Sequence, residues 1–251
     1  LKNVENALEK MKTRTACNEA VYGMLNIWRW WLRRNNGRIN EAGKKFVKVW
    51  TLLLSPFAPF AAEEAWRNLR GEGYASTHRW PETGVDEDSV FSLVHEDVLR
   101  ELMADVREIL KVVKGKPAVI KIFKAAGWKV SLAERLLGSS PSDAFGWLKE
   151  HHRDKLAVAQ RLMTRVVERL KAVEDLCGEY SKVLGAGDRK EALAKLLRVE
   201  ENIWVQAAEL IKQEIRVDVV VLDEDDASGT AEALKASQSI PLKPAVYVSR
   251  S

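Results

Sequence analysis

The stretch Thr51-Leu-Leu-Leu-Ser-Pro-Phe-Ala-Pro-Phe-Ala-Ala-Glu-Glu-Ala-Trp66 decides how the first third of this chain folds. Its apolar run meets Pro56, which disfavours a helical conformation at the residue before it. Pro59 suits the first turn of a new helix, where its missing N–H costs no hydrogen bond. The stretch therefore predicts a helix that ends near Leu54 and a second helix over 60–70.

Helical periodicity continues on both sides of this stretch. Apolar residues recur every three to four positions through 2–34, which we interpret as one long helix, and through 91–114. Asn40 is a plausible N-cap for the helix that leads to Leu54. The first 81 residues are therefore expected to form a bundle of about three helices.

The remainder of the chain contains predicted strands as well as helices. Three alternating or β-branched segments predict strands at 117–123, 215–222 and 245–248. Helices are expected between them, over 131–137, 141–150, 154–184 and 188–213. The predicted fold class is mainly α, with a helical bundle followed by a small α+β domain. The expected domains are a bundle over 1–81, an acidic linker and connecting helix over 82–114, and an α+β unit over 115–251.

The net charge of +4 conceals a block pattern. Residues 1–80 carry a net charge of +7, residues 81–110 carry −7, residues 111–213 carry +7, and the tail carries −3. Two basic blocks separated by an acidic one indicate two surfaces that face a polyanion.

Several other classes of protein do not fit the sequence. The longest apolar run, 52–62, is interrupted by prolines and is too short for a membrane span, so no membrane partner is expected. Cys17 and Cys177 are interpreted as reduced thiols of a cytoplasmic protein. The adjacent His151 and His152 point to different faces of a helix, so no metal site is expected. The chain begins with leucine inside a helical pattern, and we expect it to be a piece of a longer protein or one part of a split protein.

No catalytic residues are predicted, because the chain has no phosphate-binding glycine loop and no nucleophile motif. The pair Glu63-Glu64 lies near the start of a predicted helix, where carboxylates favour the positive end of the helix dipole. The acidic run 223–226 lacks the ligand spacing of a calcium loop and is interpreted as a solvated turn.

The segment 28–34 combines tryptophan with arginine. Arg29 and Arg33 are four residues apart on a helix and share a face, and each guanidinium can bind two phosphate oxygens. With Arg34 and Arg38, they are the candidate RNA contacts of the first domain. The alternative is that Trp28, Trp31 and Leu32 are part of the core and that the arginines are a solvated rim.

Lysines surround the first predicted strand of the second domain. Lys121 alternates with Ile120 and Ile122, so its side chain is expected on the open face of a small sheet. Lys121, Lys124 and Lys129 are therefore candidate contacts to the sugar-phosphate backbone. An equally acceptable interpretation is an edge strand that lysines protect against pairing.

Four segments, in this order, resemble class I aminoacyl-tRNA synthetases for leucine, isoleucine and valine. They are 14–16, 26–34, 53–66 and Ser76-Thr-His-Arg-Trp-Pro81. The closing segment Ile240-Pro-Leu-Lys-Pro-Ala-Val-Tyr-Val248 resembles the end of leucyl-tRNA synthetases of the archaeal and eukaryotic type. The resemblance covers nearly the whole chain and corresponds to about the last quarter of such an enzyme.

The resemblance implies a role for each domain. The helical bundle would pack near the elbow of the tRNA, with Arg29, Arg33 and Arg34 on its backbone. The α+β domain would contact the long variable arm of tRNA(Leu), with Ile240, Lys243 and Tyr247 at the RNA-facing edge and two prolines holding this segment extended. The family usually ends on an acidic residue soon after the tyrosine, whereas this chain ends Ser249-Arg-Ser251.

The parent reaction implied by the resemblance is ATP-dependent leucylation of tRNA. ATP would belong to the catalytic part, in the same or another chain, and no cofactor is expected in this segment. Three alternatives stay open: a free-standing tRNA-binding protein derived from this domain, the equivalent region of an isoleucyl or valyl enzyme, and a helical scaffold that binds another protein.

Overall fold

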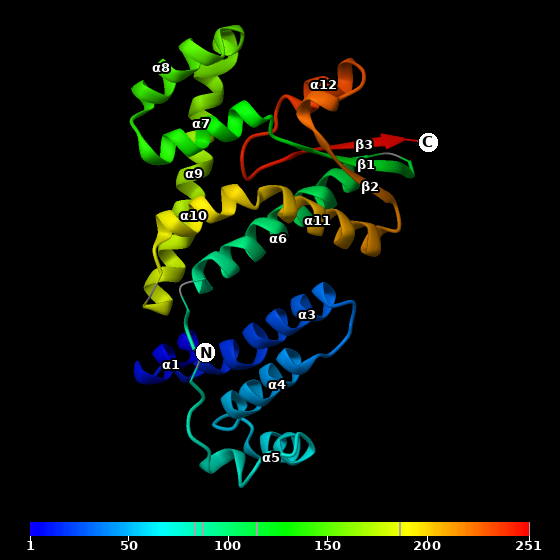
Figure 1. Cartoon of the computed structure of the whole chain (residues 1–251). Coiled ribbons are helices and arrows are strands. Elements are labelled where there is room, and N and C mark those ends of the chain that lie inside the picture. The colour runs from blue at the N-terminus through cyan, green and yellow to red at the C-terminus, as the bar shows by residue number, and fades with distance from the viewer. Residues whose placement is uncertain (83, 87, 114, 186, 251) are drawn as a thin grey trace. The chain divides into compact units, whose positions relative to one another are not determined.

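The computed structural model describes the chain except residues 83, 87, 114, 186 and 251. Its contacts divide it into two compact units, Leu1–Val85 and Asp86–Ser251. Helices make up the first unit, and the second combines helices with a three-stranded sheet (Figure 1). The predicted fold class is confirmed.

The first unit consists of short helices joined by tight turns. They are α1 (Lys2–Glu9), α2 (Thr13–Asn18), a π-helical turn (Glu19–Gly23), α3 (Met24–Arg34), α4 (Glu41–Leu54) and α5 (Pro59–Asn68). The prediction of one helix over 2–34 is wrong. The chain breaks after α1, where Met11 adopts a left-handed conformation (φ +56°) and the N–H of Lys12 donates to the carbonyl of Ala7 at 2.8 Å.

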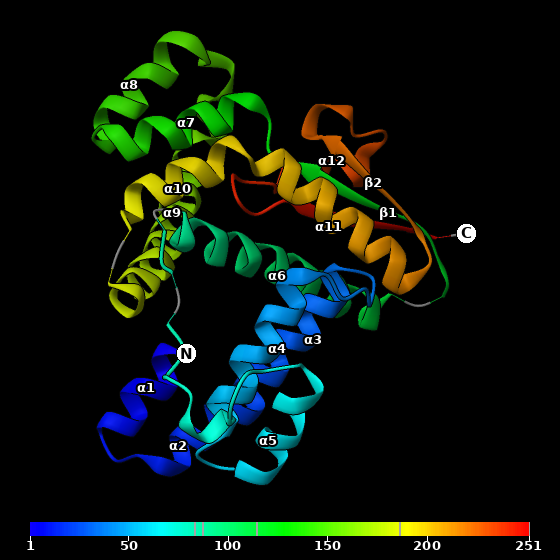
Figure 2. The ribbon, with the colours of Figure 1, turned by 60° about the horizontal axis from the view of Figure 1, so that its bottom comes forward.

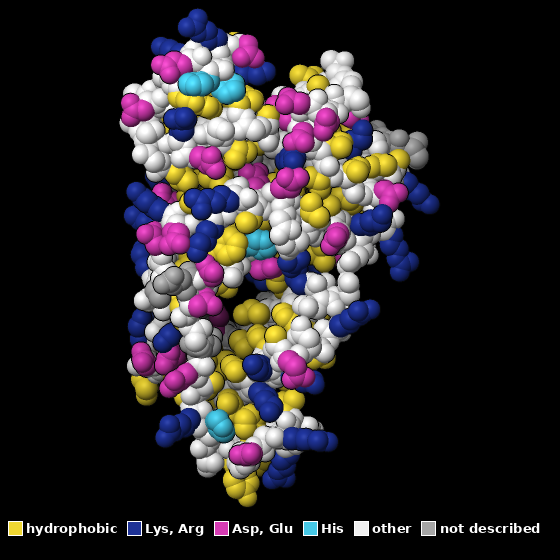
Figure 3. Space-filling view, viewed as in Figure 1, with side chains coloured by type: hydrophobic (Ala, Val, Ile, Leu, Met, Phe, Trp, Pro, Cys, Tyr) yellow, Lys and Arg dark blue, Asp and Glu magenta, His cyan; other side chains and the backbone are white. Residues whose placement is uncertain are grey.

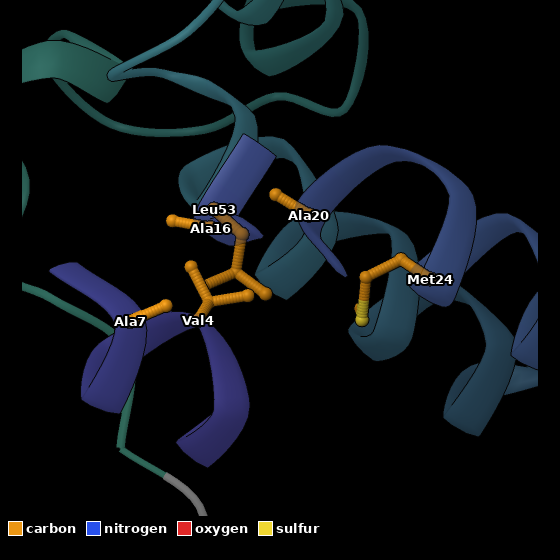
Figure 4. Close-up of a cluster of buried hydrophobic side chains, with 6 residues drawn as sticks. All are labelled: Val4, Ala7, Ala16, Ala20, Met24 and Leu53. Atoms are coloured by element: carbon orange, nitrogen blue, oxygen red, sulfur yellow. The ribbon is translucent and has the colours of Figure 1, made fainter. Parts of the chain in front are cut away.

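This break allows α1 to fold back and build the core of the unit. Val4 of α1 packs with Ala16 of α2 and Ala20 of the π-helical turn. Leu53 of α4 completes this cluster (Figure 4). Leu53 is fully buried and Val4 is 1% exposed. The alanines have no side-chain bulk beyond Cβ, so the helical segments approach closely enough to exclude water.

The predicted boundaries around the two prolines are confirmed. The Asn40 side chain accepts a hydrogen bond from the N–H of Gly43 at 3.0 Å, which caps α4. The helix ends at Leu54, and Pro59 opens α5. Glu63 accepts hydrogen bonds from the N–H groups of Ser76 at 2.9 Å and Ala75 at 3.1 Å, so it fixes the 3₁₀ turn Ala75–Thr77. These donors, with Ser76 first, lower the pKa of Glu63.

The second unit begins with α6 (Ser89–Val112) and β1 (Pro117–Lys124). It continues with α7 (Gly127–Gly138), α8 (Pro141–His151), α9 (Leu156–Leu184), α10 (Arg189–Arg198), α11 (Glu200–Ile215), β2 (Asp218–Asp223), α12 (Thr230–Ala236) and β3 (Ala245–Arg250). The strand order is β2-β1-β3, with β1 parallel to β2 and antiparallel to β3. All three predicted strands are present.

Helices cover both faces of the sheet. α6 and α11 lie on one face and α12 on the other (Figure 1), and Figure 2 shows α11 alongside the strands. The buried Ile120 and Ile122 alternate with Phe123, which packs against Ala236 and Ala245 on the α12 side. The sheet is therefore an interior layer, and the open face expected for Lys121 is occupied by α12.

Helix α6, expected as part of a connector, packs into the second unit. It contacts α9, α10 and α11, and it buries seven side chains. These are Val90, Val94, Val98, Leu99, Leu102, Met103 and Val106. Such a wide apolar stripe is typical of a helix packed against several partners rather than of an exposed connector.

Gly71 provides a test of packing in the first unit. A Cβ atom at Gly71 would lie 2.0 Å from Cε2 of Trp66, an indole that is 5% exposed and donates to the carbonyl of Glu72. We expect Gly71→Ala to lower the free energy of unfolding by about 1–3 kcal/mol because the ring cannot move without breaking these contacts. Urea unfolding followed by circular dichroism measures this change.

The control is Gly146→Ala in α8, where an added Cβ meets nothing within 4 Å. Alanine favours the helix, so this variant should be neutral or more stable by up to about 1 kcal/mol. Equal effects of the two substitutions would contradict the packing at Trp66.

Candidate nucleic-acid interface

An aromatic stack holds α3 against α4. The ring of Trp28 stacks on Trp31, with centroids 5.1 Å apart, and on Phe46 of α4 at 5.6 Å. Gly43 allows this approach, because a Cβ there would lie 2.5 Å from the Trp31 ring. Both tryptophans are half-buried and pack between the helices, in line with the alternative that assigned them to the core.

The candidate arginines lie at the end of α3 and just beyond it. Arg29 and Arg38 are exposed, whereas Arg33 and Arg34 are half-buried. The guanidinium of Arg33 lies over the Trp30 ring, 5.2 Å from its centroid, which orients the side chain. Arginine in the last turn of a helix also complements the negative end of its dipole.

Helix α4 extends this basic surface. Lys45 and Lys48 are exposed, and Lys44 pairs with Glu41 at 2.7 Å. We call Arg29, Arg38, Lys45 and Lys48 the α3–α4 basic surface. It offers exposed phosphate-binding groups from the two helices and from the turn that joins them.

The candidate lysines of the second unit face carboxylates. The Nζ atom of Lys121 lies 2.7 Å from Glu232 of α12. Lys124 pairs with Glu201 at 3.0 Å and Asp223 at 3.3 Å, and the hydrogen bond to Glu201 contributes most to raising the pKa of Lys124. Figure 3 shows acidic side chains gathered beside α12. Both lysines therefore form ion pairs within the unit, and a phosphate would have to displace a carboxylate to reach either of them.

Lys129 has an internal role instead of the expected RNA contact. It is 2% exposed, and its Nζ atom lies 2.7 Å from Oε2 of Glu224. It also donates to the carbonyls of Ser237 at 2.9 Å and Ser239 at 2.8 Å. Burial lowers the pKa of Lys129. These contacts use all three ammonium donors and leave no route to a phosphate.

The acidic turn 223–226 is not fully exposed to solvent, in contrast to the interpretation from the sequence. Besides Lys129, the Glu224 carboxylate accepts hydrogen bonds from the N–H of Ala126 at 3.2 Å and the hydroxyl of Ser239 at 3.1 Å. Asp225 and Asp226 are exposed, as expected of a solvated turn. Only the outer carboxylates of this turn are thus available to a ligand.

The segment before β3 forms a turn rather than the expected extended chain. The backbones of Ile240 and Lys243 exchange hydrogen bonds of 3.0 and 2.9 Å, with Leu242 at φ +61°. Pro241 occupies the position that favours proline in such turns. Ile240 is 4% exposed and Leu242 is fully buried, so these side chains anchor the turn in the unit.

The two polar candidates of this segment differ in their surroundings. Lys243 has a half-exposed side chain and lies 3.4 Å from Glu101. Tyr247 lies opposite Lys121 in the β1–β3 register and is half-buried beside Phe123 and Ala245. Lys243 is therefore the residue of this segment that is best placed for a phosphate.

Sequence reasoning missed a row of arginines at 161, 165 and 169. Their four-residue spacing places them on one face of α9, a signal that is visible in the sequence. Arg169 pairs with Glu101 at 2.7 Å and donates to the carbonyl of Leu242 at 2.6 Å, so it fixes the turn before β3. Arg165 donates to the carbonyl of Gln238 at 2.7 Å, and Arg161 is exposed.

Within the described part of the chain, no three His, Cys, Asp or Glu side chains are grouped to hold a metal ion. No described helix is long and apolar enough to cross a membrane.

Comparison with known proteins gives matches along the whole chain. Residues 1–123 match the model of the anticodon-binding domain of tRNA ligase. Leucine–tRNA ligase of Pyrococcus horikoshii is 31% identical over 255 aligned residues, covering 99% of this chain and 24% of the relative. Along nearly its whole length, the chain is similar to archaeal leucine–tRNA ligases.

Other relatives agree. The leucine–tRNA ligase of Aeropyrum pernix is 30% identical across 98% of the chain, and that of Archaeoglobus fulgidus is 31% identical across 99%. The chain spans about a quarter of the length of these synthetases. The resemblance inferred from the proline-containing stretch and the closing segment is thereby confirmed.

A buried carboxyl group gives a test of the second unit. Glu200 is 6% exposed, and Nε1 of Trp204 donates to it at 3.0 Å. Burial raises the pKa of Glu200 to about 7 from a reference value of 4.5. The native state therefore binds more protons than the unfolded state between these values, and its stability falls as the pH rises through this window.

We expect Glu200→Gln to remove this pH dependence, which amounts to a loss on the order of 3 kcal/mol between pH 5 and pH 8. Urea unfolding at both pH values measures it, with the exposed Glu209→Gln on the same helix as the control. Parallel pH profiles for the native chain and the Glu200 variant would show that this carboxyl is not protonated on folding.

Proposed function

We propose that this chain is the tRNA-binding part of a leucyl-tRNA synthetase and positions tRNA(Leu) for ATP-dependent leucylation. The observation that carries the proposal is the similarity to leucine–tRNA ligases over 98 to 99% of the chain. The match of residues 1–123 to anticodon-binding domains of tRNA ligases supports tRNA as the partner. The catalytic part, with its ATP, lies elsewhere in the same chain or on another one.

The first unit is proposed to contact the tRNA near its elbow. The α3–α4 basic surface supports this assignment because its cations are exposed and its helices are locked by the Trp28, Trp31 and Phe46 stack. Phosphate contacts from a rigid surface fix orientation and register without reading sequence. The family name refers to the anticodon, but the elbow is the site implied by the leucyl-enzyme resemblance.

The second unit is proposed to contact the long variable arm. Its sheet lysines are held close to carboxylates, so other cations of the unit are better candidates. Among the exposed cations that the structure describes, we choose Arg161, from the arginine row of α9, and Lys243, whose ion pair with Glu101 is long at 3.4 Å. Proteins recognise RNA arms of this kind by shape and by exposed bases.

Binding to a tRNA(Leu) transcript at several salt concentrations tests the proposal. We expect affinity to fall by about 0.7–0.9 log units per log unit of salt for each phosphate neutralised. A transcript whose variable arm is shortened to a few nucleotides should bind more weakly. No complex at low ionic strength would refute the proposal, and equal binding of both transcripts would refute the assignment to tRNA(Leu).

Substitution in the α3–α4 basic surface tests the first contact. The double change Arg29→Gln and Arg38→Gln should make the slope of log affinity against log salt less steep by about 1.4–1.8, because two phosphate contacts are lost. Fluorescence anisotropy with labelled transcript measures the slope. Arg67→Gln, an exposed arginine of α5, is the matched control and should leave the slope unchanged. An unchanged slope in the double variant would place the elbow contact elsewhere.

A further inference from the structure

The second unit contains a cavity that none of the expected RNA contacts explains. It has a volume of about 480 Å³ and is lined by the start of α7, the first half of α9 and the segments that flank α12. The buried pair of Lys129 and Glu224 forms part of its lining. This volume lies in the range of small-molecule sites and is too small for a double helix.

One side of the cavity is aromatic and another is apolar. Trp128 is half-buried at the start of α7, and its ring packs near His152 with centroids 6.1 Å apart. Across from α7, helix α9 contributes Leu162 and Val158, and Val158 is 55% exposed despite its apolar side chain. A flat aromatic ring is the kind of group that an indole face and exposed aliphatic groups accept together.

The rim of the cavity carries charge of both signs. Arg161 and Arg165 lie one turn apart on α9 and line the cavity, and Arg165 is held by its hydrogen bond to the carbonyl of Gln238. Lys155 is paired with Asp154 at 3.2 Å and adds little net charge. Asp225 lines the cavity with an exposed carboxylate, which can only accept hydrogen bonds.

These three features restrict the ligand. A simple anion would use the arginines but leave the indole and Val158 exposed to water. An apolar ligand would leave the guanidiniums and Asp225 without partners. A nucleotide satisfies all of them, because its base has apolar faces and a polar edge while its phosphate is an anion.

We infer that this cavity binds one unpaired nucleotide of the RNA, with its base against Trp128 and its phosphate on Arg161 and Arg165. The inference rests on the proposed function and adds to it a pocket that accepts a base which has left the stack. Such a pocket would allow the second unit to recognise an exposed base in addition to the shape of an arm.

Direct titration with guanosine 5′-monophosphate tests the pocket without tRNA. This probe is chosen because guanine presents two adjacent donors to a carboxylate such as Asp225. Isothermal titration calorimetry of the whole chain should show one saturable site with a dissociation constant on the order of 1 mM. Arg161→Gln and Trp128→Leu should each weaken it at least about 5-fold. Lys171→Gln, which removes an exposed charge from the same helix, should leave it unchanged.

The same variants then distinguish this inference from the proposed function. In binding to the tRNA(Leu) transcript, Arg161→Gln and Trp128→Leu should lower affinity about 5- to 20-fold. Arg161 is exposed, so its variant keeps the fold even if the Trp128 variant does not, and circular dichroism checks both. Normal tRNA binding by the Arg161 variant, or no saturable nucleotide site, would overturn the pocket while leaving the proposed function intact. Absence of any tRNA binding would overturn the proposed function and the pocket with it.

Discussion

The buried ammonium of Lys129 organises the second unit. A charge in a protein interior is costly unless it is paired and hydrogen-bonded, and Lys129 meets this demand with one carboxylate and two carbonyls. Those partners come from the turn after β2 and from the segment after α12. The lysine therefore ties the start of α7 to two stretches about 100 residues away in sequence, at Glu224 and at Ser237–Ser239.

The contacts of Lys129 also position the residues next to its partners. The fixed Glu224 sets the position of Asp225 at the rim of the cavity, and Trp128 lies directly before Lys129. On the other side, the fixed carbonyls lead into the turn that Arg169 holds through Leu242. The pocket and the segment before β3 are thus parts of one polar framework around a single cation.

The two units use their basic residues differently. In the first unit, Arg29 and Arg38 have exposed side chains. In the second, Lys121 and Lys124 are neutralised by carboxylates from other elements. A count of charges cannot distinguish these cases, although only exposed cations release counterions from RNA at no internal cost.

Local signals in the sequence were sufficient for part of this structure. The boundaries at Leu54 and Pro59 and the cap at Asn40 follow from the chemistry of single residues and were predicted. The break at Met11 was missed because the turn preserves the apolar spacing on both sides. The roles of Lys121 and Lys129 were missed because their partners are distant in sequence. Glu232 lies 111 residues from Lys121, and Ser237 lies 108 residues from Lys129, so no local pattern reveals these contacts. The arginine row on α9 was visible in the sequence, but its function depends on a cavity that only the fold creates.

Footprinting of the tRNA(Leu) transcript bound to the whole chain is the most direct test of the central claim that both units bind one tRNA. Hydroxyl-radical cleavage should reveal two protected regions, one on the backbone at the elbow and one on the variable arm. Protection confined to a single region, or spread evenly along the transcript, would contradict this account.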